Sequence, residues 1–572
     1  MRWSLFISLL LLSCRIFSQQ LLAGQVLDSI THQPLPFVSI GCVGNSNGTM
    51  SNEEGRFVLR TAMDCQLSFH LLGYRPKKIQ ISLLSKGSVV YMVPSTQTLK
   101  EVVVQSNDEA LYLTVLSVRK VLLNTVADTA RCYFLLGTQV NAQPVELLEM
   151  YYNAYWSKGT IYQLRFKNGR AALAPHNERY FMSKNHSSLF KAASMTQAHT
   201  EMPVHPLQCS ARDLRRHFVL SLSLIESGGE VYRLITFKPR KNNLSYCEGM
   251  LWLQQMEDVP VKYVFKAHHT PRHPFQPWIK GEASIEGVDF EQEWHFKLQQ
   301  NNCVPYRATI AYDYRYNWLI LQPGKGGDLA IHTTLNAFFY DYEQVFIEPV
   351  VIYDDRMYDY RKIAGLTWNE QFWMDQHSMV TARSTQQLIK QMLKEGVTIN
   401  YGGDKVTTMA DNRFLMKDLH VLWDHTKRLN VVQVSGDEAQ GAKERFHLNA
   451  QVYMDLNRVN GQLQWKTATI FDLYHSWCYL ENTPLTRCFM NIYFDLFECA
   501  RLELESQLKP TTTPEEAKQL YATIMNETNQ LAERYLNEVR MGLNEEALNA
   551  WNEVIKKQLN IDNVQLFEVY KH

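Results

Sequence analysis

The sequence has no excess of charge of either sign and no long apolar run beyond its first eighteen residues. Its 572 residues include 58 basic and 58 acidic side chains. Proteins that bind nucleic acids need a basic excess to neutralise phosphates, so this balance argues against a nucleic-acid partner. After residue 18, no stretch approaches the ~20 apolar residues of a membrane-spanning helix, so we expect no transmembrane span.

Several familiar catalytic and metal-binding motifs are also missing. The sequence contains no H-E-x-x-H zinc helix and no phosphate-binding loop. No C-x-x-C pair occurs, which removes the usual zinc-knuckle and thioredoxin-type signals. We therefore expect no cofactor and favour a non-enzymatic role, although a serine or cysteine nucleophile would leave no such local motif.

The stretch from Gly24 to Tyr74 predicts a small antiparallel β-sandwich. Apolar side chains alternate along 38–42 and again along 67–71, and the turn dipeptide Asn47-Gly48 lies between them. By strand parity, Cys42 and Cys65 both point inward. Two buried free thiols are favoured over a disulfide between them.

The same stretch resembles the carboxypeptidase-regulatory-like domain, a transthyretin-type sandwich of seven strands. The resemblance covers about Leu21 to Val104 and ends in the run L-K-E-V-V-V. It implies an accessory module found in cell-envelope proteins of the Bacteroidetes, with no peptidase activity of its own. The match is carried by Gly24, Val26, Asp28, Thr31, Pro34, Leu35, Pro36, Val38, Gly48, Thr49, Gly55, Phe57, Leu59, Gly73 and Tyr74.

The first eighteen residues are typical of a secretory signal. Arg2 precedes the apolar core Leu5–Leu12, and 16–18 suits ordinary signal-peptidase cleavage. Alternatively, 11–14 resembles a lipobox, which would give Cys14 a lipid anchor. Cleavage after Ser18 is favoured, and either route predicts an exported protein in the periplasm or associated with the outer membrane.

The whole chain is predicted to be α+β, with a helical bundle at its C-terminal end. The alternation of its central strands favours an antiparallel curved sheet or half-barrel. Strands are predicted at 161–166, 231–237, 250–254, 261–267, 278–285, 293–298 and 307–314, extended chain at 431–434, 446–453 and 463–469, and helices beginning at Asp108, Ser384, Thr483, Thr513 and Asn544. The predicted divisions are 1–18 signal peptide, 19–104 sandwich, 105–327 connector helix and β-rich domain, 328–480 mixed region and 481–572 helical domain.

A loop rich in proline and histidine is a candidate metal site. His268, His269 and His273 lie in the run HHTPRHPFQPW, and neutral imidazoles can bind a transition metal. Solvated histidines at the end of a strand would produce the same pattern, and we favour that interpretation.

Four residues near the C-terminus are candidates for acid–base chemistry. Asp472 and His475 are three apart, and Asp495 and Glu498 share one face of a predicted helix. Two carboxylates and a histidine could exchange protons or bind a cation. Salt bridges and caps along a helix face would use the same residues.

These features favour a non-catalytic binding or scaffold module of the cell envelope, with an envelope protein or a glycan as its partner. One alternative is a hydrolase that acts on polysaccharide or peptide through the four C-terminal residues. Another is a lipid or lipoprotein carrier, which would need an apolar pocket within residues 133–321.

Overall fold

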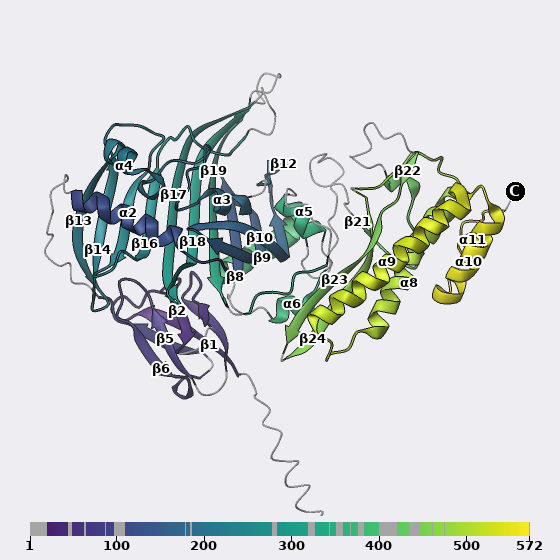
Figure 1. Cartoon of the computed structure of the whole chain (residues 1–572), viewed down its shortest axis with the longest axis horizontal. Helices are drawn as coiled ribbons and strands as arrows, with labels where there is room; N and C mark the ends of the chain where they lie inside the picture. Colours follow the sequence, from purple (N-terminus) through teal and green to yellow (C-terminus); the bar gives the residue numbers. More distant parts are fainter. Residues whose placement is uncertain are drawn as a thin grey trace, which may run out of the picture.

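The computed structural model describes most of the chain from Gln20 onward and shows an α+β protein (Figure 1). The predicted signal peptide and Cys14 lie outside the described residues. Those residues are 20–43, 48–61, 65–85, 87–95, 109–177, 179–183, 186–276, 283–318, 327–342, 344–350, 358–365, 368–375, 382–399, 420–434, 445–459, 461–473 and 475–570.

The N-terminal region is the predicted sandwich of seven strands. One sheet has the order β4-β1-β7 and the other has the order β3-β2-β5-β6. Val26, Phe57 and Phe69 are almost wholly buried between the sheets. The strands are β1 (Gln20–Asp28), β2 (Ser39–Cys42), β3 (Gly48–Met50), β4 (Arg56–Thr61), β5 (Gln66–His70), β6 (Lys77–Gln80) and β7 (Ser88–Met92).

The prediction of free thiols in the sandwich was wrong, because Cys42 and Cys65 form a disulfide. Cys42 lies opposite Leu67 in the β2–β5 pair, and Cys65 directly precedes β5. Their Cα atoms are 5.7 Å apart, within the usual range for a disulfide. The alternation of side chains along the strands correctly placed both cysteines in the interior of the sandwich. That alternation could not show that the two sulfur atoms lie next to each other.

Replacing Cys65 with alanine should destabilise the sandwich by about 3 kcal/mol, because the disulfide closes a loop of about two dozen residues in the unfolded chain. The sequence separation of the two cysteines is 23. Urea unfolding would measure the loss, and wild-type protein treated with a reductant serves as the matched control. Unfolding curves that are indifferent to reductant would contradict the expected contribution of the bond.

The centre of the molecule is an open, curved antiparallel sheet of eleven strands, which confirms the predicted curved sheet. Its order is β13-β14-β15-β16-β17-β18-β19-β8-β9-β10-β20. The strands are β8 (Asp128–Val140), β9 (Gln143–Ser157), β10 (Thr160–Leu173), β13 (Phe218–Ser227), β14 (Glu230–Pro239), β15 (Glu248–Gln254), β16 (Pro260–Ala267), β17 (Ala283–Gln299), β18 (Asn302–Trp318), β19 (Gly327–Tyr340) and β20 (Val397–Ile399).

Three local predictions need correction. The segments 278–285 and 293–298 are not separate strands, because β17 runs unbroken through 283–299, while 277–282 lie outside the described residues. Val431–Gln433 is a 3₁₀ turn, not extended chain. The helix predicted to begin at Ser384 begins one residue earlier: α7 runs over 383–395 and follows Ala382, whose side chain makes no capping bond.

Both faces of the sheet are covered over much of their area. The inner face packs against α2 (Glu109–Leu123), α3 (Ser187–Ala192) and α4 (Ala211–His217). On the outer face, the sandwich contacts β18 and β19 through Phe37, whose ring lies 5.7 Å from that of Phe338. The α7 helix packs against β10 and β20.

The C-terminal region is a small sheet covered by the predicted helical bundle (Figure 1). Its sheet has the order β21-β24-β23, and Thr483, Thr513 and Asn544 cap their helices as predicted. Among the described residues, no helix is long and apolar enough to cross a membrane. The elements are β21 (His420–Leu422), β23 (Ala450–Val459), β24 (Gln462–Asp472), α8 (Pro484–Gln507), α9 (Pro514–Val539), α10 (Glu545–Leu559) and α11 (Asn563–Leu566).

Candidate functional site

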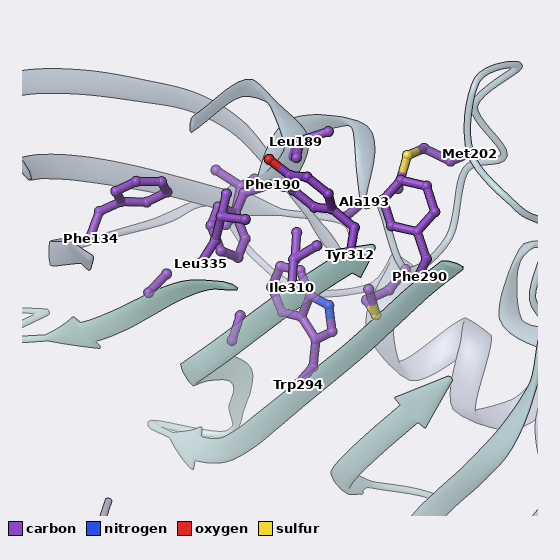
Figure 2. Close-up of a cluster of buried hydrophobic side chains, with 14 of the residues drawn as sticks. Phe134, Leu189, Phe190, Ala193, Met202, Phe290, Trp294, Ile310, Tyr312 and Leu335 are labelled. Carbon is purple, nitrogen blue, oxygen red and sulfur yellow. The ribbon is translucent and has the colours of Figure 1, made fainter. Parts of the chain in front are cut away.

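The inner face of the central sheet, where a carrier would need space, is filled by side chains. Trp294, Ile310 and Leu335 rise from β17, β18 and β19 and meet Leu189 and Phe190 of the α3 segment (Figure 2). Trp294, Ile310 and Leu335 are 0% exposed. The face therefore forms the main hydrophobic core of the molecule.

A buried carboxyl lies within this core. Glu146 of β9 accepts hydrogen bonds from Thr138 Oγ1 at 2.6 Å, from Ser183 N at 2.7 Å and Oγ at 2.5 Å, and from Tyr360 Oη. All of these donors are neutral. Burial raises the pKa of Glu146, and the hydrogen bonds oppose that shift.

A second buried carboxyl joins the neighbouring helices. Asp359, at the start of α5 (Asp359–Ala364), accepts bonds from Ser187 N at 3.0 Å and Ser187 Oγ at 2.7 Å. Lys362 Nζ lies 3.5 Å away. Since Glu146 holds Tyr360 of the same helix, the two carboxyls tie α3, α5 and β9 together, and we assign them to closure of the core.

Replacing Glu146 with glutamine should change how stability depends on pH. The raised pKa means that the folded chain holds this proton more tightly than the unfolded chain. The contribution of the Glu146 carboxyl to the stability of the fold is therefore fully present below the unfolded pKa of about 4.3. It is lost as pH rises through the folded pKa. Because glutamine cannot titrate, the free energy of unfolding of the variant should increase relative to that of the wild type as pH rises from about 4. Urea unfolding across this range tests the sign, and parallel curves would refute it.

The first C-terminal candidate pair is in contact. His475 Nδ1 lies 2.5 Å from Asp472 Oδ2, and the His475 backbone N–H donates to Oδ1 at 3.1 Å. His420 lies opposite Asp472 in the β21–β24 pair. Burial lowers the pKa of His420, and the Asp472 carboxylate opposes that shift. A histidine oriented by a carboxylate is compatible with proton transfer. The role of Asp472 and His475 in acid–base chemistry stays a prediction.

The other two candidates are held in separate ion pairs. Asp495 accepts bonds from Arg428 Nη2 at 2.6 and 2.7 Å and from Trp423 Nε1 at 2.7 Å. Glu498 accepts bonds from Arg501 at 2.6 and 2.9 Å. Burial raises the pKa of Asp495, with Arg428 opposing the shift. Both carboxylates thus have structural partners, which favours the salt-bridge interpretation over a shared catalytic centre.

The three loop histidines have different environments. His268 and His269 are exposed, with Nδ1 atoms 3.7 and 3.6 Å from Asp289, whereas the ring of His273 stacks on Phe275 at 5.8 Å. Across the described ranges, no group of three or more His, Cys, Asp or Glu side chains has an arrangement that could hold a metal ion. The metal site stays a prediction without structural support.

The segment after β2 matches the sequence pattern of a catalytic serine. Residues 44–48 read G-N-S-N-G, which fits the G-x-S-x-G pattern of a nucleophile elbow. That elbow requires a turn from strand to helix, whereas this string joins β2 to β3. Residues 44–47 lie outside the described part of the chain, and the connectivity gives no support for a nucleophile.

Sequence reasoning missed Glu146, although a signal for it exists. Glu146 shares strand parity with Leu148, Met150 and Tyr152, which all belong to the inner core. An acidic residue on the apolar side of a strand predicts a buried carboxyl that needs hydrogen-bond donors. Its donors Ser183 and Tyr360 come from distant segments and could not be predicted from the sequence.

Three solved structures that resemble this chain do so at low scores. A DUF1329 family protein from Desulfovibrio piger matches at 7% identity and TM-score 0.18, covering 42% of this chain and 96% of that one. A putative membrane-associated protein of unknown function from Bacteroides fragilis matches at 10% identity and TM-score 0.11, covering 56% of this chain and 99% of that one. A LolA superfamily protein from Nitrosomonas europaea matches at 13% identity and TM-score 0.16, covering 40% of this chain and 94% of that one. At these scores the likenesses carry no inference.

The comparison with family models concerns the N-terminal sandwich alone. No curated protein matches this sequence. The family model of the CarboxypepD_reg-like domain matches residues 22–104, which hold the two sheets and the disulfide. Residues 22–104 are therefore a carboxypeptidase-regulatory-like domain, joined here to a much larger α+β region.

Proposed function

We propose that this protein is an exported component of the cell envelope that binds or scaffolds a partner and does not catalyse a reaction. The observation that carries the proposal is the filled inner face of the central sheet. Trp294, Ile310 and Leu335 occupy the space that a lipid carrier would need for its cargo. Contacts with a partner are therefore assigned to the outer surfaces of the molecule.

The disulfide supports the exported location. Bonds such as Cys42–Cys65 form and persist in oxidising compartments outside the cytosol. The predicted secretory signal leads to the same compartment. A position in the periplasm or at the outer membrane, membership of the Bacteroidetes and a lipid anchor at Cys14 belong to the proposal, and mass spectrometry of the mature N-terminus tests the anchor.

The docking of the sandwich supports a scaffold. Arg307 of β18 lies over the Phe37 ring at 3.9 Å from its centroid. At the other end of the contact, Gly73 N donates to Ser227 Oγ at 2.7 Å. Phe37 has φ of +61°, a conformation that is costly for a bulky residue unless its surroundings maintain it. The accessory domain thus has a defined position on the sheet.

The proposal is tested by recovering the tagged full-length chain from envelope fractions of its native cell after mild cross-linking. A distinct envelope protein or a glycan should co-purify in fixed ratio, and the untagged chain is the control. Recovery of this chain with no other component, whatever its oligomeric state, would contradict the proposal.

The hydrolase is the second candidate, because Asp472 orients His475 through a 2.5 Å contact. Release of product from polysaccharide or peptide substrates, lost in His475→Ala but retained in a variant of the exposed His269, would favour it. Equal results from the two variants would remove it.

A further inference from the structure

The sandwich contacts the central sheet at one of its two ends. Strand β1 runs from Gln20 to Asp28, and the contact lies at the Asp28 end. There Tyr74 Oη donates to Asp28 Oδ2 at 2.8 Å, and the adjacent Gly73 is bonded to Ser227 of β13. The sandwich therefore projects from the central sheet (Figure 1), and its other end, which we call the distal pole, points away from that sheet.

Three exposed aliphatic side chains lie at the distal pole. Leu21 is the second residue of β1, Val43 directly follows β2, and Leu83 belongs to the 3₁₀ turn of residues 81–83. Their exposed fractions are 42%, 50% and 77%. A single exposed aliphatic residue is ordinary, but three from separate segments at one end of a domain form an apolar surface of the kind that binds a membrane or another protein.

The disulfide and the core of the sandwich hold two of these segments in place. Ile81 N donates to Cys65 O at 3.1 Å, and the Cys65 side chain is bonded to Cys42, the residue before Val43. The Ile81 side chain is buried in the core of the sandwich. The turn is therefore fixed from beneath while Leu83 stays exposed, so the apolar surface is preformed.

The chain also enters the sandwich at the distal pole. Gly87 N donates to Ala23 O at 2.7 Å, so the segment that follows the turn lies beside the start of β1, near Leu21. Strand β1 begins at Gln20, six residues after Cys14, which the alternative lipobox would lipidate. Six residues span at most about 20 Å, so a lipid on Cys14 would bring the distal pole to the membrane surface.

We propose that the distal pole rests on a lipid membrane, with Leu21, Val43 and Leu83 inserted at the boundary between headgroups and acyl chains. The proposal uses the exported location from the proposed function and no other part of it. Aliphatic side chains bind a membrane in proportion to the apolar area that they bury. A lipid tether alone would leave the orientation of the protein free, whereas three inserted side chains fix it, with the central sheet held away from the membrane.

A membrane fits this surface better than a second copy of the chain does. Three side chains bury far less area than the ~1,200 Å² at the lower limit of standard stable protein interfaces. A bilayer needs no complementary shape, so separate aliphatic side chains can enter it independently. The path of the chain, with a predicted secretory signal or lipid attachment just before β1, leads to the same occupant.

Flotation with vesicles of phosphatidylethanolamine and phosphatidylglycerol tests the proposal. The mature chain of residues 19–572 lacks Cys14 and the signal, so any binding comes from the folded protein. It should float with the vesicles. The variant Leu21→Ser/Val43→Thr/Leu83→Ser should lose about a hundredfold in partition coefficient, because three exposed aliphatic groups no longer gain by burial. Failure of the unchanged chain to float would overturn the proposal and leave co-purification with an envelope partner, the test of the proposed function, unaffected.

The matched control, Ile30→Ser/Val93→Thr/Leu244→Ser, replaces aliphatic side chains away from the distal pole. Their exposed fractions are 70%, 47% and 46%. Ile30 and Val93 lie at the end of the sandwich nearer the central sheet, since Ser29 N donates to Met92 O, and Leu244 lies between β14 and β15. This control should float as the unchanged chain does. Equal losses in the two variants, or a dimer without vesicles that only the distal variant abolishes, would contradict membrane contact, and the dimer would assign the pole to a second copy.

Hydrogen exchange provides an independent test. Vesicles should slow exchange of the backbone amides at 81–85, because the proposal places this turn at the membrane surface. Exchange at 240–245 should stay unchanged. No slowing at 81–85, or equal slowing in both segments, would show that the distal pole does not rest on the membrane.

Discussion

Replacing Lys167 with methionine is expected to destabilise the protein by about 3–5 kcal/mol, because it leaves a carboxylate buried without its cation. Lys167 of β10 and Asp455 of β23 are 1% and 0% exposed, and Lys167 Nζ lies 2.5 Å from Asp455 Oδ1. The same nitrogen donates to Ile347 O at 2.7 Å and Leu456 O at 2.8 Å. Burial lowers the pKa of Lys167, and the Asp455 carboxylate opposes the shift.

The control removes both charges. Asn369 Nδ2 donates to Asp455 Oδ2 at 2.7 Å, and an asparagine at 455 would still accept that bond. The double variant Lys167→Met/Asp455→Asn should therefore recover much of the stability that the single variant loses, as chemical denaturation would show. Equal losses in the two variants would mean that the hydrogen bonds from Lys167 Nζ to Ile347 O and Leu456 O, which both variants lack, account for the loss, and not the unpaired carboxylate.

The features that the sequence predicted correctly are local ones. The sandwich follows from alternation along 38–42 and 67–71 with turns between the strands, and its observed strands lie where that pattern placed them. The caps at Thr483 and Thr513 depend on residues no more than three positions away. Such signals need no knowledge of the rest of the fold.

The missed features depend on contacts between distant segments. The sheet places β19 beside β8, so Leu335 pairs with Leu136, and no local pattern specifies that neighbour. Asp495 illustrates the same limit in the candidate site, because its partner Arg428 lies 67 residues earlier in the chain. The pair Glu498–Arg501, at a spacing of three, was accessible from helix geometry.

Replacing Trp294 with alanine should cost about 3–5 kcal/mol, the usual loss when a large core aromatic is truncated. The Trp294 side chain is wholly buried, its ring centroid lies 6.0 Å from Phe190 and 6.2 Å from Trp156, and its Nε1 donates to Gln292 Oε1 at 3.3 Å. Chemical denaturation would measure the loss. Tyr162→Ala, at a side chain 49% exposed on β10, should change stability by no more than about 0.5 kcal/mol.

The same variant discriminates between a packed core and a lipid pocket. An apolar cavity created in a core can bind a small apolar ligand, so the variant should bind an apolar fluorescent probe and regain stability in its presence, while the wild type should do neither. Because removal of Trp294 from a true core forfeits dozens of close contacts, a loss below about 1 kcal/mol would mean that the inner face is loosely filled. Combined with probe binding by the wild type, that result would favour the carrier over the scaffold.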